Sequence, residues 1–399
     1  MAISTTTALG GVTRSARLPI ASLLALAFAG FVTILTEALP AGLLPQISAG
    51  LGISEALAGQ LVTVYAIGSL VAAIPLTAAT QGARRRPLLL AAIAGFFIAN
   101  TVTTLSSSYV LTMVARFLAG VSAGLLWALL AGYAARMVPE HQKGRAIAMA
   151  MVGTPLALSL GVPAGTFLGG LVGWRMCFGI MSGLALLLIV WVRVKVPDFA
   201  GQAAGKRLSL RHAFTVAGVR PVLFVVLAFV LAHNILYTYI APFLAAAGMA
   251  QRTDLVLLVF GVTSLLGIWI VGVLIDRHLR ALTLASTALF GLSALALGGA
   301  GDAPAMVYAA VAVWGLAFGG AATLFQTAIA KTAGDAADVA QSMLVTAWNM
   351  AIAGGGIVGG VLLDRLGVVA FSPALLVLLA ATLVVVRAAR QHGFPAARG

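Results

Sequence analysis

Two ionisable side chains stand inside long apolar stretches of the sequence, where a charge is expensive and usually functional. They are Glu37, in a stretch otherwise free of charge from 18 to 54, and Arg116, between the charge-free intervals 87–115 and 117–135. A carboxyl group in such a setting can bind and release a proton, whereas arginine keeps its charge. Together they could take up a proton and control its release.

Both residues are predicted at one depth. Counted from segment ends near Leu44 and Tyr109, Glu37 and Arg116 each lie seven residues, or about 10 Å at about 1.5 Å per residue, below the same boundary. We therefore predict a proton-coupling role for both. The alternatives are that Glu37 is a structural acid bonded to free backbone amides beside Pro40, and that the two residues form a static ion pair.

A second group of polar and aromatic residues falls near the middle of two other apolar stretches, which suits a substrate cavity. Its members are His233, Asn234, Tyr237, Trp348 and Asn349. His233 and Tyr237 are one helical turn apart and share a face. His233 could titrate or contact substrate; the alternative is a neutral histidine bonded to a neighbouring helix.

The elements that position these residues follow from composition. Of 399 residues, 61% are hydrophobic and only 9% are charged, and the mean hydropathy is +1.09. Soluble domains carry about 25% charged residues, so the composition excludes a soluble enzyme, a disordered chain and a disulfide-stapled secreted domain. The single cysteine, Cys177, cannot form an intrachain disulfide or a cysteine-based zinc site. We predict no metal and no cofactor.

Charge-free intervals long enough to cross a bilayer predict twelve transmembrane helices. They are 18–36, 56–83, 87–115, 117–135, 146–174, 176–192, 221–251, 255–275, 281–301, 303–330, 339–363 and 366–386. The interval 38–54 contains Pro40, Pro45, Gly50 and Gly52 and is predicted to be the end of the first helix followed by a loop. The apolar run after Arg17 is longer than a signal peptide core, so it is predicted to be an uncleaved first helix.

The basic residues predict the orientation. With the N-terminus inside, Arg175, Arg252 and Arg365 lie outside, while the other Lys and Arg residues apart from Arg116 lie inside. This is the positive-inside bias, which predicts an inner (plasma) membrane protein with both termini cytoplasmic. The net charge of +14 then orients the chain in the lipid bilayer and requires no nucleic acid partner.

Motifs recur in the same order in two halves of the chain, as in transporters built from repeated bundles. Gly120, Gly124 and Arg136 are matched by Gly315, Gly319 and Lys331. We predict two pseudo-symmetric six-helix bundles, residues 1–195 and 220–399, joined by a cytoplasmic linker at 196–219.

Three enzyme-like motifs lack the context their chemistry requires. The G-x-S-x-G match at 120–124 lies within a predicted helix, where its glycines favour close packing. A dinucleotide-type match at 354–359 follows no strand, and a P-loop-like run at 201–206 is one residue short. Without an ATP site, transport must use an ion gradient or be passive.

Several of these residues resemble motifs of the major facilitator superfamily, and within it the bacterial proton-linked drug and sugar efflux branch. TEALPAGLLP (36–45) resembles the acid-containing first-helix motif, and RFLAG (116–120) resembles the fourth-helix proton-relay motif, with Ala119 where glutamine is common. GVPAG (161–165) resembles the antiporter motif, which assigns Gly161, Pro163 and Gly165 to a bent fifth helix. YTYIAPFL (237–244) resembles the seventh helix of this branch.

The resemblance also implies a cytoplasmic gate. The loop signature G-x-x-x-D-R-x-G-R-R is degraded at 77–86, where Thr80 and Gln81 fall at the acid and only the arginines survive. The second copy is better preserved. The implied gate residues are Arg84, Arg85, Arg86, Asp276, Arg277 and Arg280.

The resemblance implies a monomeric secondary transporter, not an enzyme, which exports small amphipathic drug-like compounds or metabolites in exchange for protons by alternating access. Its partners would be that small-molecule substrate and protons. Sugar or nucleoside efflux is the first alternative, and a proton-coupled uptake symporter of the same fold is another. A membrane-embedded lipid-modifying enzyme would need clustered acids or histidines, and the ten acids here are scattered.

Overall fold

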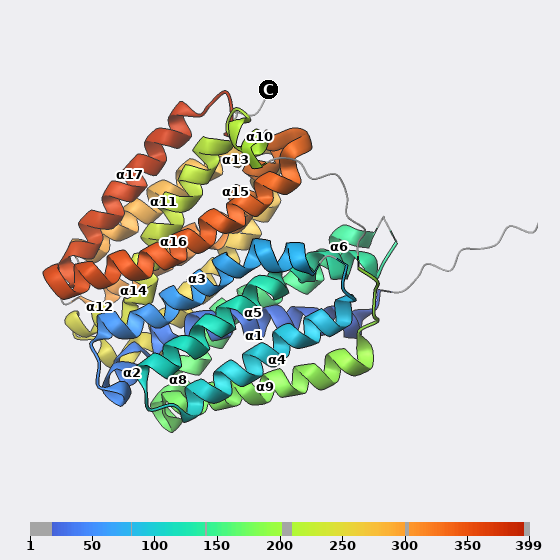
Figure 1. Ribbon diagram of the computed structural model, residues 1–399. Helices are drawn as coiled ribbons and strands as arrows, with labels where there is room; N and C mark the ends of the chain where they lie inside the picture. Colours follow the sequence, from blue (N-terminus) through green and yellow to red (C-terminus); the bar gives the residue numbers. More distant parts are fainter. Residues whose placement is uncertain (1–17, 81, 140–141, 202–209, 300–302, 395–399) are drawn as a thin grey trace, which may run out of the picture.

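The computed structural model describes residues 18–80, 82–139, 142–201, 210–299 and 303–394, and its regular elements there are helices (Figure 1). The middle of the predicted linker, 202–209, lies outside the described residues. The elements before the linker are α1 (Ile20–Gly42), α2 (Leu44–Leu51), α3 (Glu55–Ala79), α4 (Arg85–Leu105), α5 (Tyr109–Arg136), α6 (Lys143–Met151), α7 (Gly153–Leu156), the π-helix η2 (Ala157–Gly161), α8 (Val162–Val172) and α9 (Trp174–Lys195).

The elements after it begin with a short helix in the predicted linker. They are α10 (Leu210–Thr215), α11 (Val219–Thr238), α12 (Ile240–Ala246), η3 (Ala250–Arg252), α13 (Thr253–Gly299), α14 (Pro304–Gly319), α15 (Ala321–Ala333), η4 (Gly334–Ala336), α16 (Ala337–Leu366), η5 (Val368–Ala370) and α17 (Phe371–Ala388). Within α13 the backbone departs from helical geometry at His278. Two of the predicted spans therefore meet in α13.

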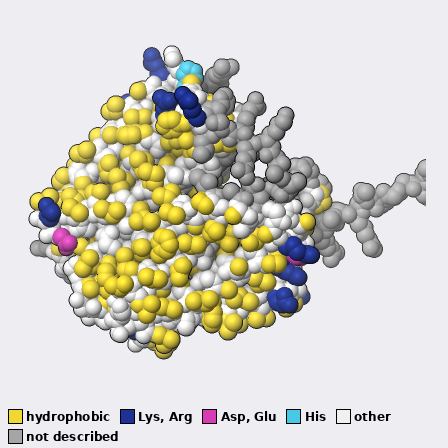
Figure 2. Space-filling view, viewed as in Figure 1, with side chains coloured by type: hydrophobic (Ala, Val, Ile, Leu, Met, Phe, Trp, Pro, Cys, Tyr) yellow, Lys and Arg dark blue, Asp and Glu magenta, His cyan; other side chains and the backbone are white. Residues whose placement is uncertain are grey.

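Twelve helical segments in the described residues are long and apolar enough to cross a membrane, which confirms the predicted span count. Only helices satisfy their backbone hydrogen bonds internally in lipid, apart from closed barrels. Large apolar side chains such as Leu187, Trp269 and Val377 are more than 60% exposed. Figure 2 shows a broad hydrophobic face with the basic side chains near its edges, as a lipid-facing surface requires.

The segment 38–54 differs from its prediction. The prediction is the end of the first helix followed by a loop; α1 does run to Gly42, but residues 44–51 form the short helix α2. Pro45 lies in the first turn of α2, where its missing N–H has no partner to lose, and Gly52 ends the helix with a φ of 66°.

Glycines let the helices of each half approach closely. A Cβ at Gly120 of α5 would collide with the backbone oxygen of Tyr65 on α3, and a Cβ at Gly315 of α14 would collide with that of Phe260 on α13. The repeated glycines therefore make equivalent contacts in the two halves. Between the halves, α3 packs against α16, and α8 with η2 packs against α13.

The helices alternate in direction, so the charged residues gather at two ends of the molecule. The basic end carries, among the described residues, Arg84, Arg85, Arg86, Arg136, Arg193, Lys195, Arg220, Arg277, Arg280, Lys331 and Arg387. The opposite end carries Glu55, Arg175, Arg252, Asp254, Asp364 and Arg365. In Figure 1, α6 and α10 lie toward the basic end, and α2 and α12 lie at the opposite end.

Candidate functional site

Glu37 lies beside a break in the hydrogen bonding of α1. Pro40 stands inside this helix, and because proline has no N–H it cannot donate to the carbonyl four residues earlier. The carbonyl of Thr36 is thereby left without its partner in the helix. The side chain of Glu37 is partly exposed, although most of its neighbours on α1 are buried.

Arg116 of α5 satisfies this carbonyl. Its side chain is 1% exposed and donates from Nη1 to Thr36 O at 2.5 Å, from Nη2 to Glu37 O at 3.2 Å and from Nε to Leu61 O at 3.1 Å. The guanidinium carbon also lies 4.8 Å from the ring centroid of Tyr65. One buried cation thus ties α1, α3 and α5 together through backbone oxygens.

The carboxyl group of Glu37 is not ion-paired with Arg116. In the described part of the chain the one side-chain ion pair joins Arg84 and Asp198, so the static pair considered as an alternative does not form. The Glu37 carboxylate still lies near enough to Arg116, Tyr65 and Tyr237 to interact electrostatically with each. A carboxyl group that is not locked in an ion pair with its neighbouring cation can exchange a proton.

Polar side chains surround this position in the first half. Tyr65 donates to Thr33 O at 3.1 Å, and Asn100 of α4 donates from Nδ2 to the hydroxyl of Thr36 at 3.2 Å. Both contacts are buried and hold the segment of α1 that ends at Glu37. The sequence analysis did not single out Tyr65 or Asn100, although Asn100 is a polar amide within a predicted span.

An aromatic cluster forms in the second half around His233. We define it as His233 and Tyr237 of α11, Phe260 of α13, and Trp314 and Phe318 of α14. The rings of His233 and Phe318 stack with centroids 3.4 Å apart and planes at 8°. Tyr237 and Trp314 lie 5.1 and 5.3 Å from His233, and Phe260 lies 4.5 Å from Trp314.

Three buried polar atoms of the aromatic cluster have no hydrogen-bond partner. They are Nδ1 of His233, the hydroxyl oxygen of Tyr237 and Nε1 of Trp314. The hydrogen bond from His233 to a neighbouring helix, considered from the sequence, is therefore not made through Nδ1. A buried polar group without a partner destabilises a protein by about 1–3 kcal/mol, so three in one cluster require an explanation.

The other predicted cavity residues lie beside the cluster or bond within their own helices. Asn234 donates to Val230 O at 2.9 Å, and Asn349 donates to Val345 O at 3.0 Å. The ring of Trp348 lies 6.2 Å from that of Phe318. Each asparagine thus uses one of its two amide N–H groups within its own helix, whereas the cluster's three unpartnered polar atoms make no hydrogen bond.

The glycine- and proline-containing helix lies against α1. Gly161 ends η2, α8 begins at Val162, and Pro163 and Gly165 follow within α8. A Cβ at Gly161 would approach Phe31, and one at Gly165 would approach Leu39. The irregular helix and the residues around Glu37 therefore contact each other directly.

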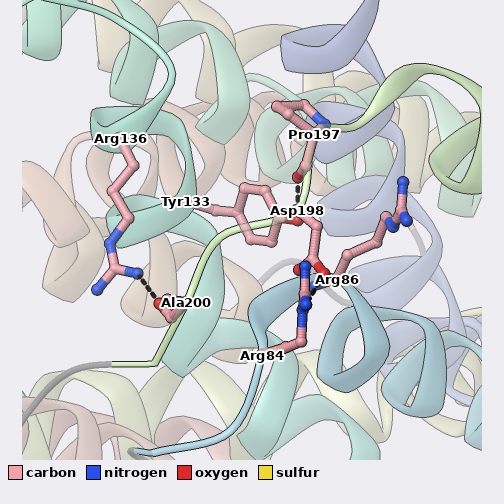
Figure 3. A network of polar contacts seen from close by, with 7 residues as sticks. All are labelled: Arg84, Arg86, Tyr133, Arg136, Pro197, Asp198 and Ala200. Carbon is pink, nitrogen blue, oxygen red and sulfur yellow. Dashed lines mark hydrogen bonds and ion pairs between the residues drawn. The ribbon is translucent and has the colours of Figure 1, made fainter.

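At the basic end, Asp198 holds the start of the linker against α4 (Figure 3). Its carboxylate accepts from Nε of Arg84 at 2.6 Å and from the backbone N–H of Arg86 at 3.0 Å. The N–H of Arg85 donates to Phe199 O at 2.9 Å. Sequence analysis missed Asp198 because it lies outside the degraded loop signature.

Two residues of α5 bind the same segment. Tyr133 donates to Pro197 O at 2.6 Å, and Arg136 donates to Ala200 O at 3.0 Å. We call Asp198, its partners Arg84 and Arg86, and Tyr133 and Arg136, which bind the neighbouring backbone oxygens, the basic-end latch.

The second copy of the loop signature makes different contacts. Arg280 donates to Phe394 O at 3.3 Å and to Arg387 O at 3.1 Å, while Arg277 is exposed. The side chain of Asp276 is outside the described part of the structure. The described hydrogen bonds of the predicted gate residues thus stay within one half, or join the first half to the start of the linker.

At the opposite end, hydrogen bonds connect the two halves. Tyr239 of the second half, which is fully buried, lies 3.3 Å from Ala56 O of the first half and donates to Gly356 O of its own half at 2.7 Å. Gln60 donates to Gly356 O at 3.0 Å and to the hydroxyl of Tyr239 at 3.3 Å. Within the described ranges, every hydrogen bond between the halves involves Gln60 or Tyr239. We call these residues the opposite-end latch.

Comparison with known proteins gives the family. The model of the Major Facilitator Superfamily matches residues 26–356. A probable sugar efflux transporter of Mannheimia succiniciproducens is 30% identical over 86% of this chain and 87% of its own length. OpdE of Pseudomonas aeruginosa, named a transcription regulatory protein, is 30% identical over 92% of this chain and 93% of its own length.

Two further comparisons concern a transport protein and a solved structure. The purine ribonucleoside efflux pump NepI of Salmonella paratyphi C is 29% identical over 86% of this chain and 87% of its own length. The crystal structure of the human organic anion transporter MFSD10 matches 93% of this chain and 100% of that chain with a TM-score of 0.70 and 14% identity, a likeness of fold alone. Since the family model spans most of the sequence, the chain belongs to the major facilitator superfamily, whose members are secondary transporters and not enzymes.

Proposed function

We propose that the protein exports a small organic solute in exchange for protons, with Glu37 as the proton carrier. The observation that carries this proposal is the carboxyl group of Glu37, which lies beside the break at Pro40 and is not ion-paired with Arg116. Arg116 is held by backbone oxygens instead. A carboxyl group in this position can gain and lose a proton while its surroundings stay assembled.

Alternating access would link proton and solute. The basic end is cytoplasmic under the positive-inside bias, which puts the opposite-end latch at the outer face. The two halves, residues 1–195 and 220–399, rock about the central cavity while the linker at 196–219 joins them. Release of the latch at Gln60 and Tyr239 lets a proton reach Glu37 from outside, and its re-formation commits the protein to the inward state. The bent helix at Gly161, Pro163 and Gly165 supports exchange over uptake by its resemblance to the antiporter motif.

The solute is a drug-like compound or a metabolite, and export of the former would confer antibiotic resistance. Nucleoside export is the second candidate. It is supported by the aromatic cluster with its unpartnered polar atoms and by the purine ribonucleoside pump at 29% identity. Sugar export is supported by the name of one relative. A sugar site usually needs several amide groups, and the middle of the spans in the second half offers chiefly those of Asn234 and Asn349.

The experiment separates exchange from proton-driven accumulation. Proteoliposomes carrying wild type or Glu37→Gln are tested with inosine, tetraphenylphosphonium and glucose. The probe that wild type transports should still exchange with itself across the membrane in Glu37→Gln, because exchange needs no net proton movement. Accumulation driven by a pH gradient should be lost. Accumulation by Glu37→Gln at the wild-type rate would contradict the proposal.

A further inference from the structure

We propose that the aromatic cluster is the solute-recognition site and that it selects planar heteroaromatic compounds with at least one hydrogen-bond acceptor, the chemistry of a nucleobase. This inference deepens the proposed function and rests on it for the role of the site in transport. It assigns Phe260, Trp314 and Phe318, which the sequence did not single out, to the same site as His233 and Tyr237.

Three buried polar atoms of the aromatic cluster lack hydrogen-bond partners. The side chains of His233, Tyr237 and Trp314 are 6%, 5% and 0% exposed, and their Nδ1, hydroxyl and Nε1 atoms have no hydrogen-bond partner. The three rings belong to two helices and adjoin one another, with centroids 5.1 to 6.1 Å apart. Buried polar groups are normally bonded, so three unbonded groups side by side mark a place where another molecule supplies the bonds.

The three unpartnered groups differ in the kind of hydrogen bond that each can make. The indole N–H of Trp314 can only donate, so its partner must be an acceptor. The hydroxyl of Tyr237 donates or accepts, and Nδ1 of His233 does either according to its tautomer. A ring nitrogen or an exocyclic carbonyl meets the requirement of Trp314, and a neighbouring ring N–H or hydroxyl can satisfy the others.

Several aromatic rings at the cluster lie in nearly parallel planes. Phe229, Phe318 and His233 form a column of nearly parallel rings, with interplanar angles of 4° and 8°. A flat solute ring can extend or enter this column by stacking, as bases stack on aromatic side chains elsewhere. A sugar has no flat ring to stack. One of the two amide N–H groups of both Asn234 and Asn349 is already bonded within its own helix, which leaves a sugar fewer donors.

The cluster's position connects recognition to the proton site. Tyr237 lies within electrostatic range of Glu37, so a solute bonded to its hydroxyl would sit near the carboxyl group across the interface of the halves. The rings contact one another, and entry therefore requires Phe318 to move. The helix carrying Phe318 ends at Gly319, and α15 begins at Ala321, which leaves this ring at a break in the tenth span.

The test is equilibrium binding to the purified full chain in nanodiscs, without a proton gradient. Radiolabelled inosine, glucose and tetraphenylphosphonium are the probes. Tyr237→Phe deletes the hydroxyl and keeps the ring, and Trp314→Phe deletes the indole N–H and leaves a smaller aromatic ring. Trp127→Phe and Tyr308→Phe are matched controls outside the cluster. We expect inosine to bind wild type at least about tenfold more tightly than glucose, and each cluster variant to weaken inosine about tenfold (about 1.4 kcal/mol) while the controls do not.

Several results would overturn the proposal. Wild type that binds glucose or tetraphenylphosphonium but not inosine would refute the solute class. Equal inosine affinity in wild type and both cluster variants would refute the site. If one cluster variant fails to fold, the other variant and the wild-type comparison of probes still decide.

The binding test of the recognition site and the transport test of the proposed function can fail independently of each other. Loss of proton-driven accumulation in Glu37→Gln with unchanged inosine binding in the cluster variants would refute the recognition site alone. Weakened binding in the cluster variants with normal accumulation by Glu37→Gln would refute the proton carrier alone.

Discussion

Arg116 is best understood through the atoms that it binds. Its three hydrogen bonds go to the backbone oxygens of Thr36, Glu37 and Leu61, and none goes to a carboxylate. The planar fork of arginine suits several acceptors at once, which the compact lysine ammonium does not. Arg116 is therefore a positioning residue that holds the broken segment of α1 and leaves the carboxyl group of Glu37 free to titrate.

Replacing Arg116 should destabilise the fold. Arg116→Ala leaves the carbonyl of Thr36 without a partner in a buried setting, which is expected to reduce the free energy of unfolding by about 1–3 kcal/mol. Arg116→Lys should recover only part of this loss, because one ammonium cannot reproduce the fork. Thermal unfolding in detergent measures both, with the exposed Arg193→Ala as the control. An unchanged melting temperature in Arg116→Ala would contradict the positioning role.

For single residues, the sequence predicted where a side chain lies better than it predicted which atoms that side chain binds. It predicted that Glu37 and Arg116 share a depth, and Arg116 does reach the backbone of Glu37. It could not predict that the cation would bind carbonyls, because the acceptor freed at Thr36 depends on where α5 meets the break at Pro40. The unpartnered atom of Trp314 was equally hidden, since only the packed structure shows which aromatic residues lack a hydrogen bond.

Among the helices and their connections, the basic-end latch compensates for the degraded loop signature. The loop lacks an acid at 80–81, and Asp198 from the start of the linker supplies one to Arg84. The backbone N–H of Arg86, followed by the Arg84 side chain, holds the pKa of Asp198 below its usual value. The carboxylate is thus favoured in the folded protein.

The sign of the pH effect follows from that lowered pKa. A carboxyl group whose pKa is depressed by folding stabilises the fold above the usual aspartate pKa of about 4 and loses this effect as the pH falls through the lower folded-state value. Asp198→Asn should therefore increase amide hydrogen exchange in peptides covering 84–90 at neutral pH. Wild type should show the same increase, corrected for intrinsic exchange, only below about pH 4. Asp254→Asn is the control, and unchanged exchange in Asp198→Asn would contradict the latch.

The opposite-end latch predicts a conformational shift. Tyr239→Phe removes the hydroxyl that approaches Ala56 and accepts from Gln60 across the two halves, which should destabilise the closed opposite end by about 0.5–1.5 kcal/mol. In a Cys177→Ser background, spin labels at Ala49→Cys and Gln251→Cys, both exposed at that end, should report a larger population of long distances. Tyr308→Phe should leave the distances unchanged. The latch would be refuted by identical distance distributions in Tyr239→Phe and wild type.

For the whole molecule, the apolar intervals were sufficient to predict twelve spans, because a membrane helix must be long and nearly free of charge. The short helix α2 was missed because Pro45 and Gly52, read as loop residues, here begin and end a helix. Contacts between the halves, such as Gln60 with Gly356, depend on the arrangement of α3 and α16 and leave no local signal in the sequence.

Orientation can be tested independently of transport. In the Cys177→Ser background, cysteines replace Gln251 at the opposite end and Ala388 at the basic end, both exposed and both leaving the basic residues intact. An impermeant maleimide applied to intact cells should label Gln251→Cys, and should label Ala388→Cys only after permeabilisation. The reverse pattern would place the basic end outside, contrary to the positive-inside bias.

The most direct test of the central claim measures protons released by solute. Inverted membrane vesicles with an acid interior receive inosine, tetraphenylphosphonium or glucose, and proton efflux from the lumen is recorded for wild type and Glu37→Gln. We expect one chemical class of solute to release protons from wild-type vesicles. The same solute should release no protons from Glu37→Gln vesicles, although both proteins are folded and bind it. Equal proton release from Glu37→Gln vesicles would contradict the assignment of Glu37 as the proton carrier.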